Sequence, residues 1–237
     1  MESLKTALFA TLNFFYGWVH DYGVAIMLLT VAVRVVMLPL TVKQAKSMHE
    51  MQRIQPKLKE LQEKYKNNKE KLQEETLKFY QEHKVNPFGG CLPTLLQMPV
   101  LIALYQTLGG TPDKPGPFLK YIASLSPAQA EAAKRFWIIL PDLTKTPKAM
   151  FAEAGAIAAF PYLLLVVLFA LSLYVPQAMQ STDRQQRTIG LYMAVMMLFF
   201  GWSVPAGVLV YWVTSSILQV AQQYVVTRAY STKEDKK

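Results

Sequence analysis

The sequence predicts an all-α, polytopic membrane protein with five transmembrane helices, an N-terminal interfacial helix and a cytoplasmic helical hairpin. Hydrophobic residues make up 52% of the 237-residue chain and charged residues only 17%, which is too apolar for an ordinary soluble domain. In addition, five apolar segments are long enough, or nearly so, to cross a bilayer. They cover residues 23–42, 88–108, 156–176, 189–204 and 207–226.

Residues 1–22 precede the first of these segments and mix apolar and polar side chains. Apolar residues recur at helical spacing, at Leu4, Leu8, Leu12, Phe15 and Val19. This pattern indicates an amphipathic helix that lies in the membrane interface. A signal peptide is the alternative, but the segment has one lysine, a short interrupted apolar run and no convincing cleavage site before Gly23.

Residues 43–84 carry a heptad-like seam and many charges. The seam consists of Met51, Ile54, Leu58, Leu61 and Tyr65, and it resumes at Leu72, Thr76 and Phe79 after a polar turn at residues 66–68. Such spacing predicts two helices that pack on each other as an antiparallel hairpin. Pro56 is expected to bend the first arm, because proline removes a helical hydrogen bond.

Residues 109–155 are expected to form an extracytoplasmic loop. Prolines at five positions rule out one long helix: Pro112, Pro115, Pro117, Pro141 and Pro147. A short helix is predicted over about 127–137, with Ser126 as N-cap and Pro127 as its first residue.

The distribution of basic residues predicts the orientation in the membrane. Residues 43–87, 177–188 and 227–237 contain 17 of the 25 Lys and Arg residues. Cytoplasmic loops are enriched in these residues, so the sequence predicts a cytoplasmic loop at 177–188, a basic cytoplasmic tail at 227–237 and an N-terminus outside. The net charge of +9 is then explained by topology and contact with anionic lipids, with no specific nucleic-acid partner.

The sequence gives no indication of an enzyme. Cys91 is the only cysteine, and His20, His49 and His83 are dispersed. The chain has no P-loop, GxSxG or HExxH pattern. We therefore expect no catalytic residues, no metal and no cofactor.

Arg34 lies inside the first apolar segment, where no acidic residue accompanies it. At ~1.5 Å per residue, it lies roughly 12 Å from Val42, close to the midplane of a ~30 Å hydrocarbon core. A guanidinium there costs about 2.5–3.5 kcal/mol on insertion scales, so it is by default a functional candidate. Snorkelling is the alternative, but a side chain that leans toward its own helix's N-terminus points away from Lys43.

The five apolar segments contain no Asp or Glu to pair with Arg34. Water, helix carbonyls, lipid phosphate or a visiting anion remain as expected partners, which favours a polar cavity. Other polar residues in these segments could line it: Thr30, Gln97, Ser172, Trp212, Ser216 and Gln219. Alternatively, hydroxyls and amides only hold helices together, at about 0.6 kcal/mol per contact.

Four motifs together resemble those of the YidC membrane-protein insertase family, related to the Oxa and Alb insertases. They are TVAVRVVMLPLT at 30–41, MQRIQPKLKELQEKY at 51–65, NPFGGCLPTLLQMPVLIALY at 86–105 and PAGVLVYWVTSSILQVAQQ at 205–223. They span nearly the whole chain in the order found in the family. The chain resembles the minimal five-span form, without the large extracytoplasmic insertion of other members.

The resemblance implies a bacterial plasma-membrane insertase whose hydrophilic groove opens to cytoplasm and lipid and carries Arg34 as its positive charge. It implies nascent membrane proteins, the ribosome, the Sec translocon and the signal recognition particle pathway as partners. Ser172 stands where some relatives have glutamine. A solute transporter and a pure assembly scaffold are the alternatives, although ion-coupled transporters normally carry carboxylates in the membrane.

Overall fold

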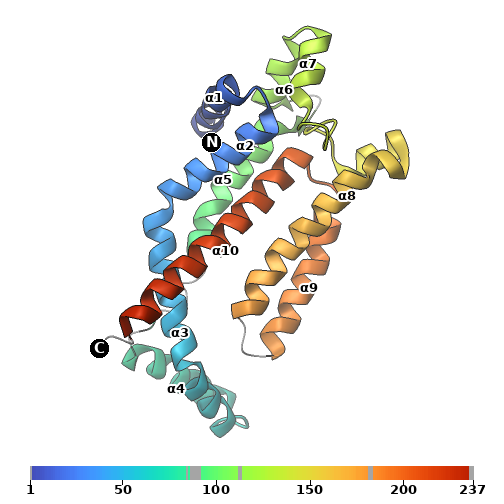
Figure 1. The fold of residues 1–237 in the computed structure, drawn as a ribbon. Helices are drawn as coiled ribbons and strands as arrows, with labels where there is room; N and C mark the ends of the chain where they lie inside the picture. The colour runs from blue at the N-terminus through green and yellow to red at the C-terminus, as the bar shows by residue number, and fades with distance from the viewer. Residues whose placement is uncertain (1, 84, 86–91, 112–113, 181–183, 235–237) are drawn as a thin grey trace. The chain divides into compact units, whose positions relative to one another are not determined.

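The computed structural model describes residues 2–83, 85, 92–111, 114–180 and 184–234, which are almost entirely helical (Figure 1). This confirms the predicted helical class. The helices are α1 (Glu2–Val19), α2 (Tyr22–Val36), α3 (Leu38–Lys64), α4 (Lys69–Glu82), α5 (Leu92–Leu108), α6 (Pro117–Ala123), α7 (Pro127–Lys134), α8 (Pro147–Gln180), α9 (Arg184–Gly201) and α10 (Ala206–Glu234). Two short strands, β1 (Gly110–Thr111) and β2 (Lys114–Pro115), pair antiparallel.

The chain forms two compact units. The first contains Met1–Val35 and Pro99–Val220, and the second contains Val36–Met98 and Ala221–Lys237.

The first apolar segment, expected as one helix over 23–42, is divided between two helices. Helix α2 ends at Val36, and α3 begins at Leu38 with Pro39 in its first turn. Proline has no backbone N–H and its ring crowds the preceding turn, so a helix cannot continue through it without distortion. The Met37 carbonyl instead accepts from the N–H groups of Leu40 and Thr41, both at 3.0 Å, and this begins α3.

In the second unit, α3 and α4 pack on each other and are joined by residues 65–68. Asn68 caps α4, because its side-chain oxygen accepts from the Lys71 N–H at 3.0 Å. Helix α3 continues through Pro56, and Ile54 of the expected seam is buried. This is the arrangement of a helical hairpin.

The core of the first unit joins α1, α2, α5, α6, α8 and α10. Its most deeply buried large side chains are Tyr22, Tyr162, Tyr211, Phe118, Leu12, Ile26, Leu104, Leu108, Leu140, Leu143 and Leu209. Helices α8 and α9 pack side by side (Figure 1). Burial of this apolar surface stabilises the unit by about 25 cal/mol per Å².

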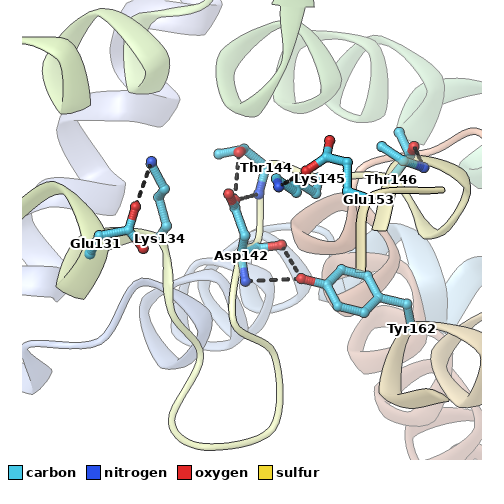
Figure 2. A network of polar contacts seen from close by, with 9 residues as sticks. Glu131, Lys134, Asp142, Thr144, Lys145, Thr146, Glu153 and Tyr162 are labelled. Atoms are coloured by element: carbon cyan, nitrogen blue, oxygen red, sulfur yellow. Dashed lines mark hydrogen bonds and ion pairs between the residues drawn. The ribbon is translucent and has the colours of Figure 1, made fainter. Parts of the chain in front are cut away.

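Helix α7 begins at Pro127 with Ser126 as N-cap, which confirms that part of the prediction. It ends at Lys134, earlier than expected, because Arg135 has an extended backbone. Beyond it, the Tyr162 hydroxyl accepts from the Asp142 N–H at 2.9 Å and donates to the Asp142 carbonyl at 2.7 Å (Figure 2). The loop after α7 is thereby fixed to α8.

Helix α8 contains a break at Gly155, where φ is 78° and ψ is −177°. This backbone region is essentially restricted to glycine, because a Cβ would collide with the backbone. Lys145 forms an ion pair with Glu153, just before the break (Figure 2). The hydrogen bond to Glu153 raises the pKa of Lys145 above its ordinary value.

One helix in the described part of the chain, Pro147–Ala178, is long and apolar enough to cross a membrane, and it includes the break at Gly155. Tyr22–Val36 and Leu38–Ser47 meet the same criteria together, as a broken pair. Arg187–Gly201 is apolar but shorter. It overlaps the segment at 189–204, which as a helix rises only ~24 Å, short of a typical ~30 Å bilayer core.

Replacing Gly155 with Ala is expected to lower the free energy of unfolding by about 1–3 kcal/mol. Beyond the local backbone, a Cβ at this position would meet no atom within 4 Å, so the cost comes from the backbone conformation alone. Urea unfolding in mixed micelles, followed by circular dichroism, measures it. Gly17→Ala is the matched control: Gly17 is also uncrowded but lies inside α1, where alanine should stabilise by roughly 0.5–1 kcal/mol. Equal effects of the two substitutions would contradict the assignment of strain to position 155.

Candidate functional site

Arg34 lies in the last turn of α2 and is buried, with 9% of its surface exposed. The same helix also buries Ile26, Leu29 and Thr30. Thr30 and Arg34 are four residues apart and therefore share one helical face. This face turns toward the protein, so the guanidinium is held inside the first unit.

The guanidinium is bound by two neutral side chains of α10. Nε and Nη2 of Arg34 donate to the Ser215 hydroxyl at 3.0 and 2.7 Å. Nη2 also donates to Oε1 of Gln219 at 3.1 Å. These bonds hold the plane of the guanidinium in one orientation, and among the residues that the structure describes they involve Nε and Nη2 but not Nη1.

No carboxylate balances this charge in the described part of the chain. None of the ion pairs found there includes Arg34. Hydrogen bonds from neutral oxygens lower the cost of burying a guanidinium, but they do not neutralise it. The buried site therefore keeps a net positive charge that can attract an anion.

Two of the expected site residues lie near the guanidinium: Gln219 in space and Thr30 along the chain. Gln219 binds it directly, so its role exceeds that of helix contact alone. Thr30 is completely buried one turn before Arg34, and its hydroxyl donates to the Ile26 carbonyl of its own helix at 2.7 Å. Its hydrogen is therefore directed to the backbone.

Three other expected residues have different neighbours. Ser172 donates to the Phe169 carbonyl within α8 at 2.7 Å. Trp212 packs edge to face against Phe169, with ring centroids 5.4 Å apart. Ser216 is buried next to Ser215 but makes none of the bonds to Arg34. Of these contacts, only that of Trp212 joins α10 to α8.

Gln97 lies in α5, within the second compact unit, and is half-buried there. It has its own interactions in the structure. Its expected place among the residues around Arg34 stays a prediction.

Ser215 is the partner of Arg34 that sequence reasoning missed. The residues expected to line the polar cavity included Ser216, one residue further along the chain. A signal was present, since Tyr211, Ser215 and Gln219 are spaced four apart and share a helical face. Burial of Tyr211 and Ser215 on that face shows that it is the inner one.

Comparison with known proteins gives the following relatives. The family model "60Kd inner membrane protein" matches residues 14–234. A membrane protein insertase YidC of Caldanaerobacter subterraneus subsp. tengcongensis is 35% identical over 98% of this chain and 98% of its own length. One of Syntrophus aciditrophicus is 35% identical over 96% of this chain but 37% of its own length.

The fold also matches a solved structure. An active YidC insertase crystal structure, with its first transmembrane domain resolved, aligns with a TM-score of 0.69 and 26% identity. The alignment covers 92% of this chain and 46% of that one. This chain thus spans less than half of that structure and a little over a third of several longer relatives.

Replacing Ser215 with Ala is expected to cost about 1.5–3 kcal/mol of unfolding free energy, because a buried charged donor loses its acceptor. Ser216→Ala is the matched control, since the neighbouring hydroxyl does not bind Arg34. Its expected effect is smaller than that of Ser215→Ala, because it leaves every hydrogen bond to Arg34 in place. Urea unfolding of both variants in the same micelles measures the difference. Indistinguishable losses would contradict the role of Ser215 in holding the guanidinium.

Proposed function

Because this chain belongs to the 60Kd inner membrane protein family, we propose that it is a membrane protein insertase. It would insert nascent membrane proteins into the bacterial plasma membrane and help them fold, without covalent chemistry. The names of its relatives and the fold of the matched structure support this proposal.

One observation carries the mechanism: the buried guanidinium of Arg34 is held by Ser215 and Gln219 and has no carboxylate partner among the described residues. Coulomb attraction grows as the effective dielectric constant falls, so an acidic residue is attracted far more strongly here than in bulk water. We propose that the missing anion is the acidic extracytoplasmic end of an inserting chain.

The hydrogen bonds around Arg34 suggest how this end would be received. Ser215 and Gln219 occupy Nε and Nη2, so the N–H groups of Nη1 would donate to the incoming carboxylate or to water. A hydrophilic groove open to cytoplasm and lipid would admit both. Holding a polar segment there shortens the apolar path that it must cross.

The apolar segment of the substrate would supply the driving force. Helix α8 exposes large apolar side chains, including Phe160, Leu164, Leu168 and Leu171, and α10 exposes Ile217. The inserting segment would slide along such faces and partition into lipid, since burying apolar surface is favourable by about 25 cal/mol per Å².

We also propose the topology and partners for this activity. Five spans would place the N-terminus outside and the C-terminus in the cytoplasm, in keeping with the distribution of basic residues. The α3–α4 hairpin would receive the substrate. The ribosome, the Sec translocon, the signal recognition particle pathway and anionic lipids are the proposed partners.

Arg34→Ala is expected to reduce insertion of a single-span substrate with an acidic tail at least tenfold, because the attracting charge is lost. The measurement is protease protection of the substrate's tail in liposomes that contain the purified protein. Arg34→Lys keeps the charge but loses the fork that binds Ser215 and Gln219, so intermediate activity is expected.

A substrate whose tail acids are replaced by Asn and Gln is the matched control. Its insertion should depend much less on Arg34. Full insertion of the acidic substrate by Arg34→Ala would rule out the electrostatic account. Passage of ions or small solutes through liposomes without substrate would instead favour a channel or transporter.

A further inference from the structure

We propose that residues 135–140 and helix α1 form one anchor in the headgroup region of the extracytoplasmic leaflet. The Asp21 carboxylate would attach this anchor to the first turn of α2 by hydrogen bonds, so that the anchor sets the depth of Arg34 in the membrane. The inference rests on the proposed function for its orientation. The contacts that support it all lie within the first compact unit.

Asp21 connects three segments with one carboxylate. Its Oδ1 accepts from the Val24 N–H at 2.9 Å, which caps α2. Its Oδ2 accepts from the Trp137 N–H at 2.8 Å, although the two residues are 116 positions apart. The loop is therefore bound to the residue that caps α2, the helix that carries Arg34.

A second contact fixes the same loop to α2. The Phe136 side chain lies against the backbone of Gly23, where an added Cβ would come within 2.1 Å of Phe136 Cδ2. Only glycine at position 23 permits this approach. The loop itself is closed by an antiparallel bridge between Phe136 and Leu140, whose backbone groups bond at 2.9 and 3.1 Å.

Helix α1 is attached to the same turn of α2 from another direction. The Tyr22 hydroxyl donates to Asn13 Oδ1 at 2.6 Å, and the Tyr22 ring stacks on Tyr16 with centroids 4.0 Å apart. Tyr22 is completely buried by these contacts. Helix α1 and the loop are thus both attached to the residues at the start of α2.

Both attached segments carry apolar side chains away from the protein. In the loop, Trp137 is 65% exposed, Ile138 is fully exposed and Ile139 is 53% exposed. The backbone of Trp137 has φ 45°, a conformation that bulky residues rarely adopt, and the Asp21 bond helps to hold it there. On α1, Phe14 and Trp18 are exposed and pack on each other.

A lipid surface fits this pair of segments. Trp side chains are enriched where the headgroups begin, and consecutive exposed apolar residues gain free energy by entering that region. Trp18 is three residues from Asp21, at most about 11 Å along the chain. Trp18 and Trp137 are therefore both attached close to Asp21, at the point where the apolar helix α2 begins. The exposed Arg135 beside the tip can face lipid phosphate.

An anchor at this level places Arg34 at a defined depth. Arg34 is 13 residues after Asp21, a rise of about 20 Å if α2 runs along the bilayer normal. The midplane lies about 15 Å below the headgroup boundary. Val31, which is exposed on α2, falls at about 15 Å and should lie at the midplane.

Nitroxide labels on single cysteines test these depths in a Cys91→Ser background, in liposomes of phosphatidylethanolamine and phosphatidylglycerol. The depth of each label is obtained from the ratio between its accessibility to oxygen and its accessibility to a water-soluble nickel chelate. Ala128→Cys and Phe160→Cys are the references for water and hydrocarbon, since both side chains are exposed on their helices. We expect the Ile138→Cys label at the headgroup boundary and the Val31→Cys label at the midplane.

Two variants test the attachment of the loop to the start of α2. Asn at position 21 retains one acceptor oxygen, so Asp21→Asn can still cap α2 but cannot also bind Trp137. Gly23→Ala displaces Phe136 and leaves Asp21 intact. In each variant, the accessibility of the Ile138→Cys label to the nickel chelate should increase at least twofold. Gly17→Ala, where a Cβ meets nothing within 4 Å, should leave it unchanged.

The outcomes separate this proposal from the proposed function. An Ile138 label with the accessibility of Ala128 would overturn the anchor, as would protection from both reagents, which indicates a protein partner or second copy. A Val31 label far from the midplane would overturn the depth assignment. Label depths do not depend on insertion activity, so a correctly anchored protein that inserts nothing would contradict only the proposed function.

Discussion

The buried guanidinium of Arg34 donates hydrogen bonds to Ser215 and Gln219, and no carboxylate among the described residues neutralises it. Arginine keeps its proton under all ordinary conditions, so this charge cannot be removed by titration. Burying a charge whose partners are neutral costs free energy, so stability alone does not account for an arginine at this position. The need to keep one positive charge inside an apolar fold therefore explains why polar groups gather on α10, and it points to a partner that supplies the negative charge.

The geometry of the site depends on keeping α2 and α10 in register, and the loop after α7 does this at their first turns. Its Asp21 contact holds the start of α2. The carbonyls of Leu143 and Lys145 accept from the N–H groups of Gly207 and Ala206 at 2.8 and 3.0 Å, which satisfies the first turn of α10. Since Arg34 lies on α2 and its acceptors lie on α10, one loop positions both halves of the site.

The sequence was sufficient to predict the helical class, the start of α7 and the buried charge, because hydrophobic periodicity, capping residues and an unpaired Arg34 are local features. The four-residue spacing of Tyr211, Ser215 and Gln219 was a signal for Ser215, but the sequence did not show which face of the helix turns inward, because helix rotation is set by packing against neighbours. The break at Met37 was missed although Pro39 is a local signal. The bond between Asp21 and Trp137 had no local signal at all, since it joins residues 116 positions apart.

The claim that the Arg34 site receives an acidic segment is tested most directly by photo-crosslinking from position 212. Trp212 lies about one turn before Ser215 on α10 and packs on Phe169, and its half-buried aromatic ring can be replaced by the larger aromatic side chain of benzoylphenylalanine. A ribosome-bound nascent chain with an acidic tail should form an adduct at this position, and the adduct should be lost when the tail acids are replaced by Asn and Gln. Equal adducts with both tails would contradict the account, because contact would then be independent of charge.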